Sequence, residues 1–256
     1  MTRNSKSEVR PALVAVDFTS TDLRLLLSTP EQQLIANEQY QLPTLDDEEA
    51  WAWEVGGRLS TLFSRDGEPL FALGIAIACP GMVHPIRGVL TESRAQEGWN
   101  ELHVVDAIRR HINAPTVAID RVQAGLRGEM TAGAAIDATD VLYVSVREST
   151  IVAAILSSGT IIRGAHHRSG RINSTDDARE IATIAAALDS ALVILDTVNE
   201  NADEIESRTR KELKKVRAGG EVIISKLGTR APLLGALEAA AIVAYEGQHT
   251  IENDNQ

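Results

Sequence analysis

The sequence predicts an α/β protein that contains the same folding unit twice. Short apolar runs of strand length alternate with longer stretches in which apolar residues recur at helical spacing. The order of three strands, helix, strand, helix, strand, helix occurs twice, with the seam near residue 121. A chain of 256 residues suits one large or two small domains. We therefore expect ligands to bind in a cleft between the two halves.

The first copy begins with three apolar runs, followed by helices that alternate with two further strands. Acidic residues at 46–49 suit the positive end of a helix dipole and mark the start of the first helix. Apolar residues then recur at helical spacing, so Trp51 and Trp53 are interpreted as core residues. The expected elements are strands 12–16, 22–28 and 33–42, helix 46–62, strand 71–78, helix 99–112, strand 115–119 and helix 121–133.

The second copy repeats this order with shorter connections. The expected elements are strands 141–146, 151–157 and 160–163, helix 177–190, strand 191–195, helix 202–218, strand 221–225 and helix 232–245. We assign residues 9–121 to the first domain and 122–231 to the second, with packing of the closing helix 232–246 back on the first domain left open. The polar tails, 1–8 and 247–256, are expected to be frayed.

Composition excludes several kinds of partner. The net charge of −11 argues against nucleic acid and an anionic membrane surface, because phosphates require clustered Lys and Arg. The longest apolar runs are well short of the roughly 20 residues that span a bilayer. Cys79 is the single cysteine and cannot form an internal disulfide, which fits a reducing compartment. The sequence therefore predicts a cytoplasmic protein that binds neither membrane nor DNA.

Asp120 is the first candidate for a functional residue. It ends the apolar run Val117–Ile119 and precedes a helix, which places it at the carboxyl end of a strand, where ligands bind in open α/β sheets. A carboxylate there is a candidate general base. Asp is also a favoured N-cap residue, so a purely structural role for Asp120 remains open.

Five stretches can be compared with known families: the strand that ends in Asp17, the strand and turn 74–83, Gly98-Trp99, the Asp120 stretch and residues 142–152. Together they resemble the ROK family of bacterial sugar kinases and sugar-responsive repressors, in the actin-like ATPase superfamily. The resemblance extends from Val9 to Tyr245. It implies two ribonuclease-H-like domains, each a mixed five-stranded sheet with helices on both faces, with a cleft between them. It also implies a homodimer.

The phosphate motifs that the resemblance implies are largely replaced. In the first motif, Asp-x-Gly-Gly-Thr, only Asp17 and Thr21 remain, and the glycines that admit phosphate are lost. The second motif, a glycine run in the family, contains Arg147, Ser149 and Thr150. Asp196 follows a strand where the family has a glycine-rich adenosine turn. We therefore expect no tight ATP binding.

The sugar-binding motifs are replaced as well. The resemblance places Pro80, Gly81 and Trp99 in the sugar cleft. The two asparagines that the family has there are replaced by Ala95 and Ile119 in this chain. Where the family has the Glu of a Glu-x-Gly-His motif, this chain has Arg171, which reverses the charge at that position. The family's cysteine-rich zinc segment has no counterpart in the sequence. We expect no zinc or other metal site. Ten polar residues precede the first strand, too few for the helix-turn-helix of the family's repressors.

These replacements predict a non-catalytic ROK-like protein, sugar-kinase-like or repressor-core-like, that regulates by binding a sugar-like ligand or a protein. Asp120 would then be the remnant of a catalytic base. One alternative is an active sugar kinase that uses ATP and magnesium, with Asp120 as the base. The other is a structural partner subunit of a functional relative.

Overall fold

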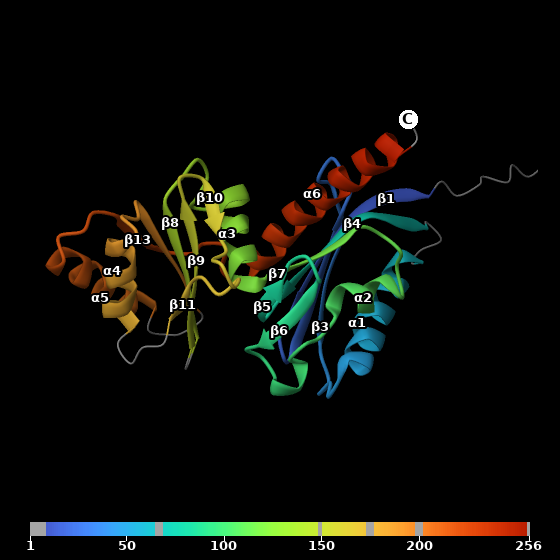
Figure 1. The fold of residues 1–256 in the computed structure, drawn as a ribbon, viewed down its shortest axis with the longest axis horizontal. Helices are drawn as coiled ribbons and strands as arrows, with labels where there is room; N and C mark the ends of the chain where they lie inside the picture. Colours follow the sequence, from blue (N-terminus) through green and yellow to red (C-terminus); the bar gives the residue numbers. More distant parts are fainter. Residues whose placement is uncertain (1–8, 65–68, 148–149, 173–176, 198–201, 255–256) are drawn as a thin grey trace, which may run out of the picture. The chain divides into compact units, whose positions relative to one another are not determined.

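The structure is a computed structural model that describes residues 9–64, 69–147, 150–172, 177–197 and 202–254. It divides into two compact units (Figure 1). Unit 1 comprises Met1–Asp120 and Ala236–Gln256, and unit 2 comprises Arg121–Gly235. The closing helix therefore begins in unit 2 and continues in unit 1.

Unit 1 is built on a five-stranded mixed sheet with the order β3-β2-β1-β4-β7. The first three strands are antiparallel neighbours, and β4 and β7 run parallel to β1. The predicted strands of the first copy are all present. Their bounds are β1 Arg10–Phe18, β2 Asp22–Ser28, β3 Leu34–Gln41, β4 Leu70–Cys79 and β7 Thr116–Asp120.

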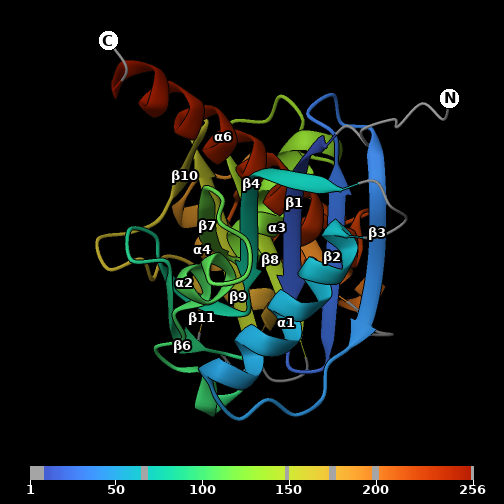
Figure 2. The same cartoon turned by 90° about the vertical axis from the view of Figure 1, so that its right-hand side faces the viewer.

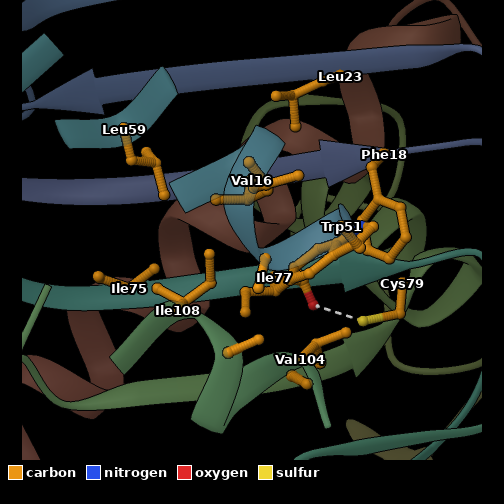
Figure 3. Close-up of a cluster of buried hydrophobic side chains, with 14 of the residues drawn as sticks. Val16, Phe18, Leu23, Trp51, Leu59, Ile75, Ile77, Cys79, Val104 and Ile108 are labelled. Atoms are coloured by element: carbon orange, nitrogen blue, oxygen red, sulfur yellow. Dashed lines mark hydrogen bonds between the residues drawn. The ribbon is translucent and has the colours of Figure 1, made fainter. Parts of the chain in front are cut away.

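Helices cover both faces of this sheet. On one face, α1 (Glu48–Phe63) and α2 (Val104–Arg109) complete the main apolar core, part of which is drawn in Figure 3. Figure 2 views unit 1 with α1 in front of the sheet. On the other face, the closing helix α6 (Ala231–Asp254) packs so closely that a Cβ on Gly74 would lie 2.3 Å from the carbonyl oxygen of Ala240.

The two neighbouring tryptophans of α1 differ in environment. Trp51 is fully buried, and its ring lies 5.0 Å from that of Phe18. Trp53 is 76% exposed, so its interpretation as a core residue is wrong. The two side chains are separated by two positions, or about 200° around a helix, so one helix cannot direct both at the same core.

The segment between β4 and β7 differs from its prediction. Two short strands, β5 (Gly81–His84) and β6 (Val89–Ser93), form an antiparallel hairpin that the sequence analysis missed. Residues 99–103 are not α-helical, because Leu102 forms a β-bridge with Leu90. The α-helix α2 therefore begins only at Val104, and Trp99 ends the short 3-10 helix η2 (Glu97–Trp99).

Unit 2 repeats the sheet order of unit 1, with β10-β9-β8-β12-β13 and an additional short strand, β11, beside β9. As in unit 1, the first three strands are antiparallel and the other two run parallel to β8. The strands are β8 Val141–Arg147, β9 Thr150–Ser157, β10 Thr160–Ile162, β11 Arg171–Ile172, β12 Leu192–Thr197 and β13 Glu221–Ile224.

Helices also cover both faces of the second sheet. One core lies under α4 (Asp177–Ala187) and α5 (Ala202–Lys215), and the other lies under α3 (Arg121–Ala132). The fold class predicted from the sequence is thus confirmed. The closing helix α6 continues to Asp254, beyond its predicted end at Tyr245. Within the described ranges, no helix has the length and hydropathy that a bilayer-spanning segment requires.

Candidate functional site

Two aspartates lie at the carboxyl ends of β1 and β7, the two parallel strands that flank β4 in unit 1. Asp17 is near the end of β1 and lies opposite Ala78 of β4. Asp120 ends β7 and lies opposite Cys79, also on β4. The side chain of Asp17 is 1% exposed and that of Asp120 is 14% exposed. The edge at which the strands end is the position that binds ligands in open α/β sheets.

An arginine is paired with each of these aspartates. Nη2 of Arg94 donates hydrogen bonds to both carboxylate oxygens of Asp120, at 2.8 and 2.9 Å. Nη1 of Arg24, on the adjacent strand β2, lies 3.5 Å from Oδ2 of Asp17. The Arg94 guanidinium thus contacts both oxygens with which a general base would accept a substrate proton.

Arg94 is held in place by a loop rich in hydrogen bonds. Its backbone N–H donates to the carbonyl oxygen of Pro80 at 2.7 Å. Oγ of Ser93 accepts hydrogen bonds from the backbone N–H groups of Ala95 and Gln96, both at 3.1 Å. The side-chain amide of Gln96 donates to the carbonyl oxygen of Leu45 at 2.6 Å. These contacts fix the backbone that carries Arg94 at the ends of the strands.

Cys79 lies between the two carboxylates, at the end of β4. Burial, and then the negative charges of Asp120 and Asp17, raise the pKa of the Cys79 thiol well above its usual value. The thiol donates to the carbonyl oxygen of Ile77 at 3.5 Å (Figure 3). A fully buried neutral thiol is a packing residue and a poor nucleophile.

The other predicted site residues of unit 1 have structural partners. Thr21 is exposed in the turn between β1 and β2, where its hydroxyl donates to Asp22 at 2.7 Å. Gly81 begins β5, and a Cβ there would lie 2.1 Å from the carbonyl oxygen of Glu92. Trp99 is fully buried, and its indole N–H donates to the carbonyl oxygen of Leu45 at 2.8 Å.

Pro80 is also buried, and Phe18 packs between Trp51 and Trp99. The structure therefore brings Asp17, Asp120, Pro80 and Gly81 together at the strand ends of unit 1. Trp99 faces the core and offers no surface to a ligand.

In unit 2, an arginine and an aspartate that replace two nucleotide motifs contact each other. Nη2 of Arg147, at the end of β8, donates to Oδ2 of Asp196 on β12 at 2.8 Å. Nη1 of Arg147 donates to the carbonyl oxygen of Asp196 at 2.8 Å and to that of Val146 at 2.9 Å. Asp196 is 2% exposed, so the charge of Arg147 compensates a buried carboxylate.

Tyr143 lies on the same face of β8 as Arg147. Burial, and then the nearby Asp196, raise the pKa of Tyr143 well above its usual value. The hydroxyl of Tyr143 and Oδ1 of Asp196 are both buried, and neither has a hydrogen-bond partner among the described residues. A Cβ on Gly125 would lie 2.5 Å from this hydroxyl, so glycine in α3 makes room for the tyrosine.

Of the remaining predicted residues of unit 2, two lie on β9 and β11 and one is undescribed. Thr150 begins β9, opposite Arg147, and Arg171 begins β11, opposite Val152. Ser149 lies outside the described residues. Of the described residues, no three His, Cys, Asp or Glu side chains are grouped so that they could hold a metal ion.

Sequence analysis missed Arg94 as a site residue. The resemblance located a family asparagine at Ala95, and Arg94 directly precedes it. The signal that could have identified Arg94 was its charge, directly beside Ala95, where the family has a binding residue. Its partner, Asp120, is 26 positions away in the sequence. No local pattern identifies that pair.

The strand order, repeated in two units, is that of the actin-like ATPase fold. The sequence model of the ROK family matches residues 13–173. The chain therefore belongs to the ROK family.

Solved structures similar to the chain include kinases and a regulator. A ROK family transcriptional regulator, a homolog of E. coli MLC protein, has a TM-score of 0.74 and 11% identity, covering 91% of this chain and 79% of its own. A ROK family glucokinase from Streptomyces griseus, in complex with glucose and AMPPNP, has a TM-score of 0.72 and 14% identity, covering 90% and 99%.

An inorganic polyphosphate/ATP-glucomannokinase from Arthrobacter sp. strain KM has a TM-score of 0.68 and 17% identity, covering 91% and 99%. At these identities the similarity shows the fold alone. No curated protein sequence matches the chain.

Proposed function

We propose that the chain is a non-catalytic ROK family protein that regulates by binding a small sugar-like ligand or a protein. The observation that carries this proposal is the pair between Arg94 and Asp120. A general base must present a free oxygen to the hydroxyl that it deprotonates. Arg94 donates to both oxygens of Asp120, so a substrate hydroxyl would have to compete with a charge-assisted contact at each of them.

The pair between Arg147 and Asp196 supports the same proposal. Backbone N–H groups bind phosphates most readily in glycine-rich loops, where no side chain intervenes. Here Arg147 stands in the expected phosphate loop, and its guanidinium is anchored to Asp196 and two carbonyl oxygens. The glycines that would admit a nucleotide are replaced, and two of the replacements, Arg147 and Asp196, stabilise each other.

The relatives do not decide between catalysis and regulation, since the similar structures include a transcriptional regulator and sugar kinases. The second candidate is an active sugar kinase. It is favoured by the retention of Asp17 and Asp120 at the ends of the two strands that flank β4. In that case Asp120 would be the base and Asp17 would orient magnesium.

A kinase assay and a thermal shift assay distinguish these functions. We expect the purified protein to form no ADP from ATP and magnesium with glucose, mannose or N-acetylmannosamine. We also expect millimolar ATP with magnesium to leave the melting temperature unchanged, because only a ligand that binds the folded state raises it. Sugar-dependent ADP release that Asp120→Asn abolishes would refute the proposal, and Lys215→Met, on an exposed helix face, serves as the control variant.

A further inference from the structure

Trp53 is an exposed tryptophan that the fold does not use. It is 76% exposed on α1, whereas Trp51 and Trp99 are fully buried. Among the described residues, the side chain of Trp53 has no hydrogen bond, no ring contact and no cation over its face. Tryptophan is a highly buried residue on average, and it is enriched among the residues that anchor protein interfaces. The indole of Trp53 therefore offers a large surface to a partner.

The neighbours of Trp53 on α1 leave the indole accessible. Residues four positions apart lie on one face of a helix, so Glu49 and Gly57 flank Trp53. Glu49 is exposed, and its carboxylate has no partner among the described residues. A Cβ on Gly57 would meet no atom within 4 Å, so the space beside the indole is open. We call Glu49, Trp53 and Gly57 the α1 outer face, and α1 lies in front of the sheet in Figure 2.

The charge of this region favours a cationic partner. Unit 1 contains ten Lys or Arg and 21 Asp or Glu residues, a net charge of −11. Arg58 is the only basic residue of α1, and its guanidinium donates to Glu54 at 2.8 and 2.9 Å and lies 4.7 Å from the ring of Tyr40. No cation of α1 is left for Glu49 or Trp53. A second copy of unit 1 would be repelled by its like charge, whereas a basic segment would be attracted.

We propose that the α1 outer face binds an arginine side chain in a basic segment of a partner protein. The guanidinium stacks on the indole of Trp53, because the face of an aromatic ring attracts a cation and tryptophan attracts it most strongly. The planar fork of the same group donates to the carboxylate of Glu49, one turn before Trp53. The surface includes none of the residues at the strand ends, so the inference does not depend on whether the chain binds a sugar-like ligand.

An NMR titration that follows the indole N–H resonances tests the proposal. The protein has three such resonances, one for each tryptophan, and Trp53→Phe identifies the one that belongs to Trp53. The probe is a blocked pentapeptide of alternating glycine and arginine. We expect it to shift the Trp53 resonance and to leave those of the buried Trp51 and Trp99 in place. The same peptide with citrulline, a neutral analogue of arginine, should shift none of them.

Matched variants separate this contact from general attraction to an acidic protein. In calorimetric titrations with the arginine peptide, Trp53→Ala should raise the Kd about threefold to thirtyfold, because it removes the aromatic face. Glu49→Gln should raise the Kd about twofold to fivefold, as expected for an exposed ion pair. Glu204→Gln changes an exposed glutamate in the first turn of α5, in unit 2, and should leave the Kd unchanged.

Four results would overturn the inference. The first is a Trp53 resonance that stays in place at about 10 mM arginine peptide, a concentration that detects even weak binding. The others are equal shifts with the citrulline peptide, an undiminished affinity of Trp53→Ala, and a Trp53 resonance that moves with protein concentration alone, which would assign the surface to a second copy. Should Trp53→Ala fail to fold, Trp53→Phe decides, because its smaller ring attracts a cation less strongly and an unchanged Kd would overturn the inference as well.

Discussion

Pairing of aspartate with arginine recurs at the strand ends of each unit. In unit 1 the pairs are Arg24 with Asp17 and Arg94 with Asp120, and in unit 2 the pair is Arg147 with Asp196. Asp17 and Asp196 are almost fully buried, and an isolated carboxylate in such a position is very costly. Arg24 and Arg147 therefore each stabilise a buried charge.

Removal of Arg147 should destabilise unit 2 strongly. We expect Arg147→Met to lower the free energy of unfolding by about 3 kcal/mol, because it leaves the buried Asp196 without a counter-charge. Urea unfolding followed by far-UV circular dichroism measures this change. The double variant Arg147→Met/Asp196→Leu should recover most of the loss, since an apolar pair needs no desolvation of charge.

An exposed ion pair in the same unit provides the control. Lys215 is 67% exposed and pairs with Glu212 on α5, so Lys215→Met should change the stability by less than about 1 kcal/mol. An Arg147→Met variant that is as stable as the parent chain would show that the pair with Asp196 contributes nothing.

At the scale of elements, glycine allows α6 to approach the sheet of unit 1. A Cβ on Gly74 of β4 would lie 2.3 Å from the carbonyl oxygen of Ala240 and 2.9 Å from Cβ of Ala244. The first of these neighbours is backbone, which cannot rotate away. The close packing of helix and strand therefore depends on the absence of a side chain at residue 74.

Two glycine-to-alanine substitutions should have opposite effects. Gly74→Ala should lower the free energy of unfolding by about 1–3 kcal/mol, because the added methyl group forces α6 away from β4. Gly57→Ala adds the same group inside α1, where nothing lies within 4 Å, and should stabilise the protein by up to about 1 kcal/mol. Chemical denaturation of both variants makes the comparison, and equal effects would contradict this account of the packing.

At the scale of the molecule, charge and aromatic residues are distributed unevenly. Unit 1 contains ten Lys or Arg and 21 Asp or Glu residues, a net charge of −11, whereas unit 2 contains 15 of each and is neutral. All three tryptophans, Trp51, Trp53 and Trp99, also lie in unit 1. Tryptophan fluorescence therefore reports the unfolding of unit 1 specifically.

Folding of unit 1 should be linked to proton binding by Cys79. The pKa of this thiol is raised in the folded state, chiefly by burial and then by Asp120 and Asp17. In the unfolded chain, a thiol loses its proton near pH 8.5. Above that pH the folded state binds more protons than the unfolded state, so stability falls as pH rises towards the folded pKa.

Unfolding experiments between pH 8.5 and 9.5 test this linkage. The thiol contribution should approach a slope of about 1.4 kcal/mol per pH unit once the unfolded thiol is ionised. Cys79→Ala should remove that part of the slope. Identical pH profiles of the parent chain and Cys79→Ala, followed by tryptophan fluorescence in urea, would disprove the linkage.

The repeated order of strands and helices was predictable because its signals are local. Apolar runs and helical spacing are properties of neighbouring residues, and the order of elements along the chain follows from them. The hairpin of β5 and β6 was missed, and helix 99–112 was predicted too long, because both depend on contacts across a turn. Leu102 pairs with Leu90, and no periodicity in the sequence predicts that β-bridge.

The sequence by itself determined that this is a duplicated α/β protein, and its resemblance to the ROK family implied the actin-like fold, with Asp17 and Asp120 retained where strands end. Only the tertiary structure decided what surrounds those carboxylates. Arg94 reaches Asp120 across 26 positions, and Arg147 reaches Asp196 across 49. Arg94 meets its partner because its backbone is bonded to Pro80 at the end of β4, and Arg147 meets its partner because β8 and β12 end at the same edge of a sheet. Both contacts are consequences of tertiary packing, which no local sequence pattern encodes.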